Sequence, residues 1–253
     1  MKKIIAISLC CCFCLCSLMI PHDTAFGAEK GKTVKTTATI SEYNILMSMS
    51  GKSMSSLRSM GFSRTQAKMI KAKAVPKAKC GDVTYTISYT KSKFRYKKGN
   101  TYLQTKMTWS WKKLPHFLAS DIAAMTTSEH FAMTSGSASI NYYKGGKKSS
   151  NKKTVKKRAF TKNSGKGAYC KFPMAQLMKY KKKYYYYDAL SGSMTVNWRV
   201  SGNVKSVGIS SNYGHTTVSC VPSVSFGAGG GSISFSPVAC VKKGVEAYRN
   251  IRR

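Results

Sequence analysis

Acidic residues are scarce in this chain of 253 residues, which has 8 Asp and Glu against 43 Lys and Arg and a formal net charge of +35. Only seven carboxylates lie beyond residue 27, so few are present for acid–base catalysis or a hard-metal cage. The length suits one domain with appendages and allows a substantial core. A hydrophobic content of 42% excludes a disordered polybasic chain.

Sequence signatures of common enzymes are also missing. The chain has no nucleophile elbow, HExxH motif, P-loop or dinucleotide fingerprint, and the glycines at 227–231 join two strand-like runs. The densest titratable cluster holds His116, Asp121, Glu129 and His130, but neither a helix nor a strand places all four on one face. Only Asp121 and Glu129 offer a carboxylate pair of the kind a glycosidase uses. The sequence therefore predicts a non-enzymatic protein without a metal or other cofactor.

The N-terminus has the pattern of an export signal. Two lysines precede an apolar run from Ile4 to Ile20, and Ala25-Phe26-Gly27 places small residues at the positions that favour cleavage before Ala28. An uncleaved anchor would need a longer span, and a lipoprotein would need a small residue before one of the N-terminal cysteines. We therefore expect residues 1–27 to be a signal peptide. The protein is expected to be secreted, or held non-covalently at the cell wall.

Four cysteines lie beyond the signal: Cys80, Cys170, Cys220 and Cys240. In an oxidising compartment they can form two disulfides in three connectivities, and buried free thiols are the alternative. No Cys/His cluster has the spacing of zinc ligands. The chain also lacks an Asn-x-Ser/Thr sequon, which favours a bacterial over a eukaryotic secreted protein.

Residues 28–79 are predicted to form a basic N-terminal segment with a helical hairpin. Residues 28–40 show no pattern and are expected to be a flexible basic lead, whereas residues 41–73 are expected to be helical. Gly61 suits the left-handed position that ends one helix, and Ser63 with Gln66 forms a capping box that begins the next.

The run from Leu57 to Ile70 carries two resemblances. Its Met60-Gly61-Phe62-Ser63 string looks like the loop of ubiquitin-associated domains, but it matches only about 15 of the roughly 40 residues of such a domain. An export signal argues against a ubiquitin role, so we interpret this likeness as convergence on a capped turn. The run is also similar to a short helical hairpin in uncharacterised exported proteins of Gram-positive bacteria. Some of those proteins continue into β-rich sequence with a strand end similar to Trp109-Ser110-Trp111-Lys112-Lys113-Leu114-Pro115. That resemblance implies a secreted architecture and no activity.

From Cys80 onward the hydrophobic periodicity changes to two. Val83, Tyr85, Ile87 and Tyr89 alternate with hydroxylated residues, and the same pattern recurs at 107–111 and 194–200. Further strand-like runs lie near 138–143, 155–162, 167–172, 183–188, 204–210 and 216–226. Eight to ten short strands predict a mainly β fold, an antiparallel β-sandwich or jelly-roll over residues 80–240. Residues 117–131 are expected to hold one helical turn or a long crossover.

The apolar positions in the last two strand-like runs predict how the two strands pair. Matching apolar to apolar positions pairs Phe226 with Ile233, Val224 with Phe235 and Pro222 with Pro237. In that register Cys220 and Cys240 lie on opposite faces, which disfavours a direct bridge between them. The alternation of serine and apolar residues also suits a membrane-inserting hairpin. Prolines in mid-strand instead favour an edge or surface feature.

Basic residues are concentrated in the segment 130–187, which contains 15 Lys and Arg and no carboxylate. Lys144–Arg158 is expected to be a mobile basic loop, and a second lysine cluster adjoins a run of tyrosines that begins at Tyr184. Basic patches edged by exposed tyrosines suit a polyanion or a lipid headgroup layer. The predicted binding side chains are Lys144, Lys147, Lys148, Lys152, Lys153, Lys156, Lys157, Arg158, Lys181, Lys182 and Lys183, with Tyr180 and Tyr184 as surface aromatics.

Residues 241–253 form a basic tail. Its apolar positions Val241, Val245, Tyr248 and Ile251 recur at helical spacing, which suits a short amphipathic surface helix. Because lysine dominates over arginine in the chain, binding should be diffuse rather than site-specific. The sequence thus predicts a secreted cationic protein that binds anionic extracellular or cell-envelope polymers such as teichoic acids. The alternative is a membrane-active protein of bacteriocin or toxin type that acts on anionic lipid. Non-specific nucleic-acid binding also remains open, and the sequence does not settle the oligomeric state.

Overall fold

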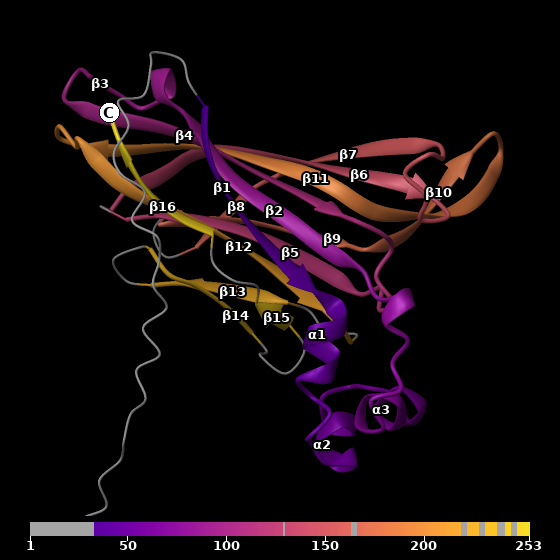
Figure 1. Cartoon of the computed structure of the whole chain (residues 1–253). Helices are drawn as coiled ribbons and strands as arrows, with labels where there is room; N and C mark the ends of the chain where they lie inside the picture. The colour runs from indigo at the N-terminus through magenta and orange to yellow at the C-terminus, as the bar shows by residue number, and fades with distance from the viewer. Residues whose placement is uncertain are drawn as a thin grey trace, which may run out of the picture.

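Two stacked antiparallel sheets make up most of the structure, a computed structural model in which three short helices lie at one end (Figure 1). The structure describes residues 33–128, 130–162, 166–218, 222–227, 231–236, 241–243 and 247–253. The expected signal peptide at 1–27, Glu129, Val245, Cys220 and Cys240 lie outside the described residues. The prediction of a mainly β, antiparallel fold is confirmed.

The larger sheet has eight strands. Its order is β1 (Thr33–Ser41), β2 (Asp82–Thr90), β4 (Asn100–Trp111), β11 (Lys183–Ser201), β6 (Ala132–Lys144) and β7 (Lys152–Arg158), while β3 (Arg95–Lys97) pairs with β4 and β10 (Ala175–Tyr180) pairs with β11. One face of this sheet is polar because hydroxylated residues occupy alternate positions in successive strands. A single row across six strands reads Thr37, Thr86, Thr108, Ser193, Ser139 and Lys156.

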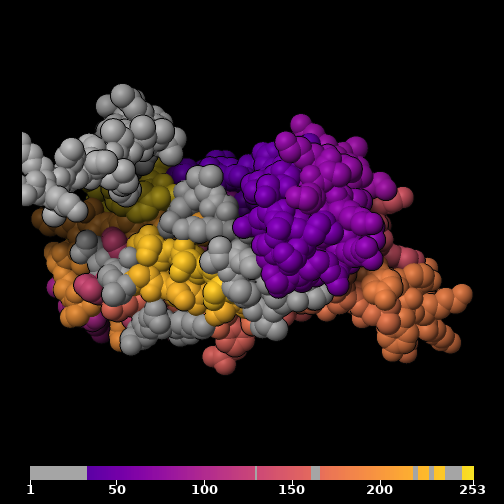
Figure 2. Space-filling view, turned by 90° about the horizontal axis from the view of Figure 1, so that it is seen from below, coloured from indigo at the N-terminus to yellow at the C-terminus, as the bar shows by residue number. Residues whose placement is uncertain are grey.

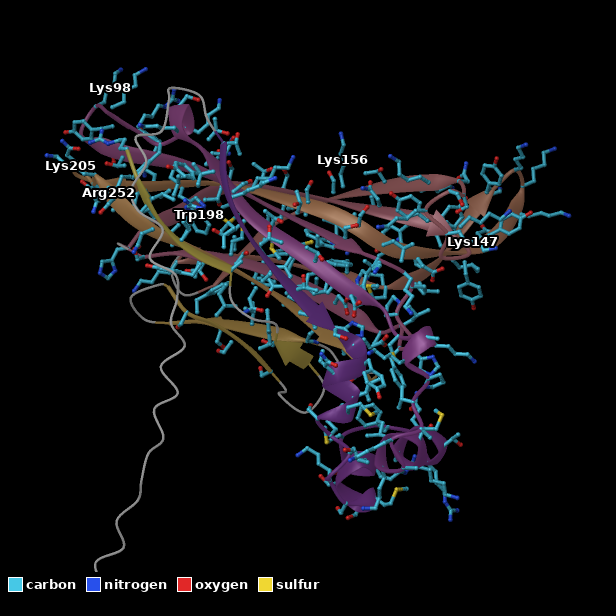
Figure 3. The ribbon with its side chains drawn as sticks, viewed as in Figure 1. Lys98, Lys147, Lys156, Trp198, Lys205 and Arg252 are labelled. Carbon is cyan, nitrogen blue, oxygen red and sulfur yellow. The ribbon has the colours of Figure 1, made fainter. Side chains whose placement is uncertain are left out.

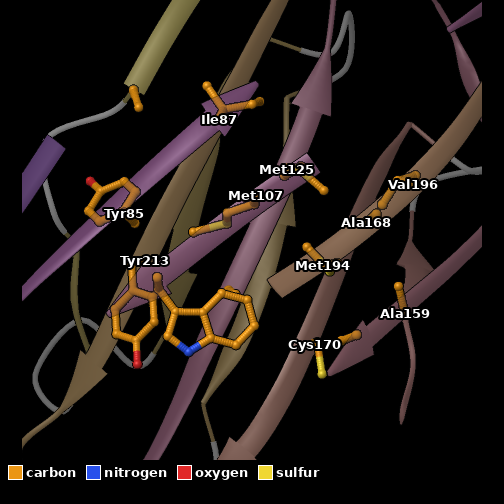
Figure 4. Close-up of a cluster of buried hydrophobic side chains, with 14 of the residues drawn as sticks. Tyr85, Ile87, Met107, Met125, Ala159, Ala168, Cys170, Met194, Val196 and Tyr213 are labelled. Carbon is orange, nitrogen blue, oxygen red and sulfur yellow. The ribbon is translucent and has the colours of Figure 1, made fainter. Parts of the chain in front are cut away.

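The other face of the larger sheet forms the core between the sheets. Trp109 on β4 lies opposite Gly192 on β11, where a Cβ atom would meet the indole Cζ2 at 2.2 Å. The indole stacks on Phe172 of the smaller sheet with 5.3 Å between ring centroids. Figure 4 shows side chains of both sheets meeting in this core, with Met107 near Met125. Because Gly192 has no side chain, it leaves the room that the Trp109 indole fills.

The middle of the smaller sheet is covered on both faces. Its order is β15 (Val241–Lys243), β12 (Ser206–Thr216), β5 (Ser120–Thr127), β9 (Gly167–Pro173) and β8 (Phe160–Lys162), with β16 (Ala247–Arg252) also pairing with β12. On β5, Ala123 and Met125 belong to the core between the sheets. Ile122 and Ala124 belong to a second apolar cluster on the opposite face. Both sides of β5 are therefore buried.

The second cluster joins the helices to a separate two-stranded sheet. The helical elements are α1 (Glu42–Met47), α2 (Met54–Ser59), α3 (Arg64–Lys71) and the 3₁₀ turns η1 (Lys77–Lys79) and η2 (Lys91–Lys93). Strands β13 (Ser223–Phe226) and β14 (Ile233–Ser236) pair with each other in the predicted register, with Phe226 opposite Ile233 and Val224 opposite Phe235. The apolar side chains of this hairpin pack in one cluster with Leu46 of α1.

The capping box predicted at the start of the third helix is also confirmed. The Ser63 hydroxyl accepts from the Gln66 N–H at 3.1 Å, and the Gln66 side chain accepts from the Ser63 N–H at 2.8 Å. Gly61 has φ +98°, the left-handed conformation expected of it. Within the described ranges no helix is long and apolar enough to cross a membrane.

The expectation for residues 117–131 was wrong, because residues 120–127 form strand β5. An alternating pattern requires one exposed face, and β5 is buried on both. The flexible lead expected at 28–40 is likewise contradicted at Thr33–Ser41, which forms β1 beside β2. Its inward positions are only half-buried up to Ala38, so its alternation is weak.

Two further expectations are corrected at the basic segments. Within Lys144–Arg158, residues 152–158 are not a mobile loop but strand β7, which pairs with β6. The tail does not form an amphipathic helix, because Ala247–Arg252 is strand β16. The helical interpretation placed Tyr248 and Ile251 on one face, whereas in the strand Ile251 is buried and Tyr248 is exposed on the other face.

Candidate functional site

The basic side chains predicted to bind a polyanion divide into two groups on β7. Lys152, Lys156 and Arg158 are exposed on the polar face of the larger sheet. Lys153 and Lys157 are half-buried on the other side, where Lys157 donates to the Lys171 carbonyl at 3.2 Å. Figure 3 shows Lys156 reaching outward from β7. The outward side chains form what we call the β7 cationic stripe: Lys152, Lys156 and Arg158.

The end of β6 and the turn before β7 carry three more of the predicted residues. Lys147 is exposed, while the Lys148 ammonium donates to the Ser110 hydroxyl at 2.6 Å across the polar face. Lys144 is half-buried and points to the β10–β11 hairpin, where its Nζ atom lies 3.4 Å from the ring centroid of Tyr185. The structure therefore uses Lys144 to hold this hairpin rather than to extend the stripe.

The β10–β11 hairpin projects from the end of the larger sheet (Figure 2). Leu177 lies opposite Tyr186, and Lys179 lies opposite Tyr184, so these four side chains share one face. Leu177 is 56% exposed, Tyr184 63% and Tyr186 69%. We call the three apolar members of this surface the hairpin aromatic face: Leu177, Tyr184 and Tyr186.

The opposite face of the hairpin is anchored to the body. Tyr180 and Tyr185 meet edge to face at 6.4 Å, and the Lys144 ammonium lies over both rings. The Tyr187 hydroxyl donates to the Asn151 side chain at 2.9 Å. Lys153 lies over the Tyr187 ring and donates to the Lys179 carbonyl. Tyr180 is thus half-buried, whereas Tyr184 is an exposed aromatic.

The hairpin turn places two lysines in an unfavourable conformation. Lys181 and Lys182 have φ +46° and +65° between the paired residues Tyr180 and Lys183. Two-residue hairpin turns of this kind favour Asn-Gly, because a Cβ atom in the left-handed region costs about 1–2 kcal/mol per residue. Non-glycine residues in such regions often accompany function, so the lysines at this turn are candidates for a binding role.

A buried ionic centre lies between the helices and the smaller sheet. The His215 Nδ1 atom is 3.0 Å from the Asp121 Oδ1 atom, and its Nε2 atom is 3.5 Å from the Glu42 Oε1 atom. All three side chains have no exposed surface. Glu42 begins α1, Asp121 lies on β5 and His215 lies on β12, so the centre joins three distant segments.

Backbone donors complete this centre. The Glu42 carboxylate accepts from the N–H groups of Gly81, His116 and Phe117 at 3.0, 2.8 and 2.8 Å. Asp121 accepts from the Tyr213 hydroxyl at 2.7 Å and from the Thr216 N–H at 3.1 Å. Such donors stabilise the charged form of a buried carboxylate.

The pKa values in the centre follow from burial and charge together. Burial alone would lower the pKa of His215, but Asp121 and Glu42 raise it to about 9. Burial would raise the pKa of Glu42, but the nearby His215 and the backbone donors together bring this pKa below its usual 4.5. The centre is therefore an ion-paired joint sealed from solvent, and its geometry serves the fold.

Sequence reasoning missed this centre because its members are far apart in the chain. It grouped Asp121 with His116, whereas the structure places Asp121 against His215. A signal was present in the run Ile122–Met125, since consecutive apolar residues indicate a strand buried on both faces, and a carboxylate buried beside them needs a partner.

The remaining predicted site residues are cysteines. Cys80 and Cys170 are buried free thiols, so no disulfide joins these two. Burial raises the pKa of each thiol to about 11, which leaves both protonated and unreactive at neutral pH. No group of three or more His, Cys, Asp or Glu side chains in the described part of the chain is arranged to hold a metal ion.

No family model and no curated protein matches the chain. Among solved structures, one titled "Pore forming protein" matches 90% of this chain and 95% of its own at 9% identity and a TM-score of 0.36. The Clostridium perfringens NetB toxin in its membrane-inserted form matches 87% and 94% at 6% identity and a TM-score of 0.23. The KRT10-binding region domain of the pneumococcal serine-rich repeat protein PsrP matches 72% and 87% at 8% identity and a TM-score of 0.25. These neighbours include pore-forming toxins at weak similarity.

Proposed function

We propose that this protein is an exported, non-enzymatic protein that binds anionic lipid surfaces through the β10–β11 hairpin. The observation that carries the proposal is the hairpin aromatic face, Leu177, Tyr184 and Tyr186, beside the lysines of the turn. We classify the two stacked sheets that carry the hairpin as a β-sandwich.

The composition of this face fits a membrane interface. Among the described residues, seven large apolar or aromatic side chains are exposed, and three of them share this face. Tyrosine favours the boundary between headgroups and acyl chains, where its ring is shielded and its hydroxyl stays hydrated. A soluble polyanion offers no such apolar layer, so the exposed leucine and tyrosines favour lipid.

The positive charge of the turn adds electrostatic attraction to an anionic lipid surface. Lys179, Lys181, Lys182 and Lys183 surround the tip of the hairpin, and the described hairpin contains no acid before Asp188. A lysine near an anionic leaflet contributes about 1 kcal/mol of binding free energy. The left-handed conformations of Lys181 and Lys182 support a role for these charges, because the turn retains them despite their conformational cost.

Anchoring of the opposite face presents this surface in a fixed orientation. Lys144, Lys153 and Asn151 hold the inward tyrosines against the body. A preorganised surface loses less conformational entropy when it binds than a flexible loop would.

Co-sedimentation with vesicles tests the proposal. The full chain without residues 1–27 would be mixed with phosphatidylcholine vesicles that either contain or lack phosphatidylglycerol. We expect the Leu177→Ser/Tyr184→Ser/Tyr186→Ser variant to bind the anionic vesicles at least about tenfold more weakly, because roughly 1.4 kcal/mol corresponds to a tenfold change.

A matched control separates this face from general hydrophobicity. Tyr96, Leu118 and Tyr248 are 43%, 41% and 47% exposed elsewhere on the molecule. Their joint substitution by serine removes the same residue types and should leave vesicle binding within about twofold, since a twofold change is well under 1 kcal/mol. Equal losses in both triple variants, or no loss in the hairpin variant, would contradict the proposal.

Release of an encapsulated dye from the same vesicles distinguishes docking from permeabilisation. Dye release that depends on the hairpin aromatic face would extend the proposal to a toxin- or bacteriocin-like, membrane-active protein. Binding without release would limit it to surface attachment.

A second candidate function is diffuse binding of anionic cell-envelope polymers. The β7 cationic stripe supports it, because Lys152, Lys156 and Arg158 point outward from an edge strand that has serine-rich β6 as its neighbour. Teichoic acid binding that falls steeply with salt, and falls again in Lys152→Gln/Lys156→Gln/Arg158→Gln, would support this function. Salt-insensitive binding would contradict it.

A further inference from the structure

A groove between α2 and α3 has no role in either of the two candidate functions. The groove has a volume of about 800 Å³ and is lined by both helices. In Figure 1 these helices lie at the foot of the molecule, away from the β10–β11 hairpin. Four of the seven lining residues are cationic and none is acidic: Arg58, Arg64, Lys68 and Lys71.

Three of these cations form a stripe on α3. Arg64, Lys68 and Lys71 recur at helical spacing, so they lie on one face of the helix. The adjoining side of the helix buries Ala67 and Ile70 in the second apolar cluster. Like charges four residues apart destabilise a helix. An anion seated in the groove would relieve this repulsion.

Arg58 approaches from the opposite wall of the groove. Its Nη1 atom donates to the Phe62 carbonyl at 2.9 Å, which fixes the position of the guanidinium. A guanidinium has five N–H donors, so this bond leaves donors that can bind an oxyanion in the forked geometry that phosphate prefers. Arg58 on α2 and Arg64 on α3 therefore line the same groove from two elements.

Apolar atoms also line the groove. Met54 is half-buried on α2, and Ala72 follows α3. The stems of the lysines add further apolar surface. The lining thus suits a ligand in which a phosphate is attached to an organic group.

We propose that the groove between α2 and α3 is a binding site for phosphate esters. The phosphate is held by Arg58 and Arg64, Lys68 and Lys71 neutralise its charge, and Met54 and Ala72 contact the organic part of the ligand. The site is independent of the hairpin, so either can fail without the other.

Nuclear magnetic resonance titration of the full chain without residues 1–27 tests this site with soluble probes. The probes are glycerol phosphate and a short-chain phosphatidylglycerol below its micelle concentration. We expect saturable shifts of amide signals in residues 54–72 with at least one probe. Binding of both assigns the site to phosphate esters in general, and binding of the phosphatidylglycerol alone assigns it to a lipid headgroup. Binding of neither overturns the proposal.

Two variants of equal charge change make the test specific. Arg64→Gln/Lys68→Gln/Lys71→Gln should weaken binding at least about tenfold. Lys93→Gln/Arg95→Gln/Lys97→Gln removes one arginine and two lysines from the exposed η2–β3 region and should change the affinity less than about twofold. Equal losses in the two variants would show diffuse attraction only, and no loss in the α3 variant would exclude the groove.

Forked recognition is tested by a conservative variant. Arg58→Lys/Arg64→Lys keeps every charge but removes both guanidinium groups, and we expect it to lose several-fold affinity for the bound probe. Unchanged affinity would contradict the roles given to the two arginines. The Leu177→Ser/Tyr184→Ser/Tyr186→Ser variant should retain the amide shifts, which separates this site from the hairpin.

Discussion

The two sheets of this protein differ in what covers them. The larger sheet packs one face against the core and exposes a polar face of serine, threonine and lysine. The smaller sheet lies between that core and a second apolar cluster, so β5 is buried on both faces. A sheet with one exposed face can therefore be recognised in the sequence by its alternating hydrophobic and polar residues, whereas a sheet that is buried on both faces cannot. The ionic centre also lies on this enclosed sheet. The buried charges are therefore found where both faces of the sheet are buried.

The largest expected effect comes from breaking the centre on the enclosed sheet. His215→Gln removes the cation of the centre and leaves the Glu42 and Asp121 carboxylates without their charge partner in a site without solvent. Removing one partner of a buried ion pair typically costs about 3–5 kcal/mol of the free energy of unfolding. Urea denaturation of the variant and of His116→Gln, a histidine whose side chain lies outside the centre, measures this effect. A loss below about 1 kcal/mol would show that the centre contributes little.

The same centre predicts a pH dependence that an exposed polar face would not have. The raised pKa of His215, about 9, stabilises the fold fully below the ordinary value of 6.5, and this contribution is lost as the pH rises through 9. The lowered pKa of Glu42 contributes above 4.5 and is lost as the pH falls further.

We therefore expect the melting temperature to be highest between about pH 4.5 and 6.5 and to fall on both sides. Thermal unfolding followed by circular dichroism across this range tests the expectation. His116→Gln should show the same profile as the parent, because its side chain lies outside the centre. A profile that stays flat from pH 6.5 to 9 would argue against a charged His215.

The next largest loss of stability is expected on the inner face of the larger sheet. Gly192→Ala would place a Cβ atom 2.2 Å from the Trp109 ring, which cannot move freely because it stacks on Phe172. Overpacking of this kind costs about 1–3 kcal/mol. Gly202→Ala is not a suitable control because Gly202 has φ +87°, whereas Gly51→Ala meets nothing within 4 Å. Similar chemical denaturation curves for Gly192→Ala and Gly51→Ala would contradict the packing argument.

A smaller effect of opposite sign is expected at the hairpin turn. Lys181→Asn/Lys182→Gly suits the left-handed turn and should stabilise the protein by about 1–2 kcal/mol. The same change removes two charges and should weaken binding to anionic vesicles. A variant that is both more stable and a weaker binder would identify the lysine turn as a compromise between folding and binding. Unchanged vesicle affinity would instead remove these lysines from the proposed function.

The smallest effect is expected on the polar face of the larger sheet. Thr86→Ala removes a side chain whose hydroxyl lies 2.9 Å from that of Thr37 on the exposed face. Surface substitutions of this kind usually change stability by no more than about 0.5 kcal/mol. A larger loss in urea denaturation would show that the hydroxyl rows contribute to the fold.

The sequence allowed the strands of the larger sheet to be predicted more readily than those of the smaller one. Val83, Tyr85 and Ile87 are buried while their neighbours are not, and this asymmetry is visible as alternation. The capping box at Ser63 and the pairing of Phe226 with Ile233 were also predictable, because both follow from local chemistry. Strand β5 was not, since its neighbours on both sides are set by distant segments.

The candidate sites also have some features that could be predicted from the sequence and others that could not. The lysines near Tyr184 were predicted from their concentration along the chain. Their separation into a stripe and an anchored hairpin depends on the pairing of β10 with β11, which alternation does not reveal. The contact of His215 with Glu42 depends on the three-dimensional fold, because 172 positions separate the two residues.

The exposed edges of the larger sheet have one further consequence. Strands β1 and β7 end the sheet, and both carry lysines that face solvent, including Lys35 and Lys156. Lysines on edge strands oppose the addition of a strand from another molecule, which is a common route to aggregation and fibrils. Counter-charges on an anionic surface would weaken this barrier. If the protein gathers on such a surface as proposed, the edge strands of neighbouring copies come within reach of one another.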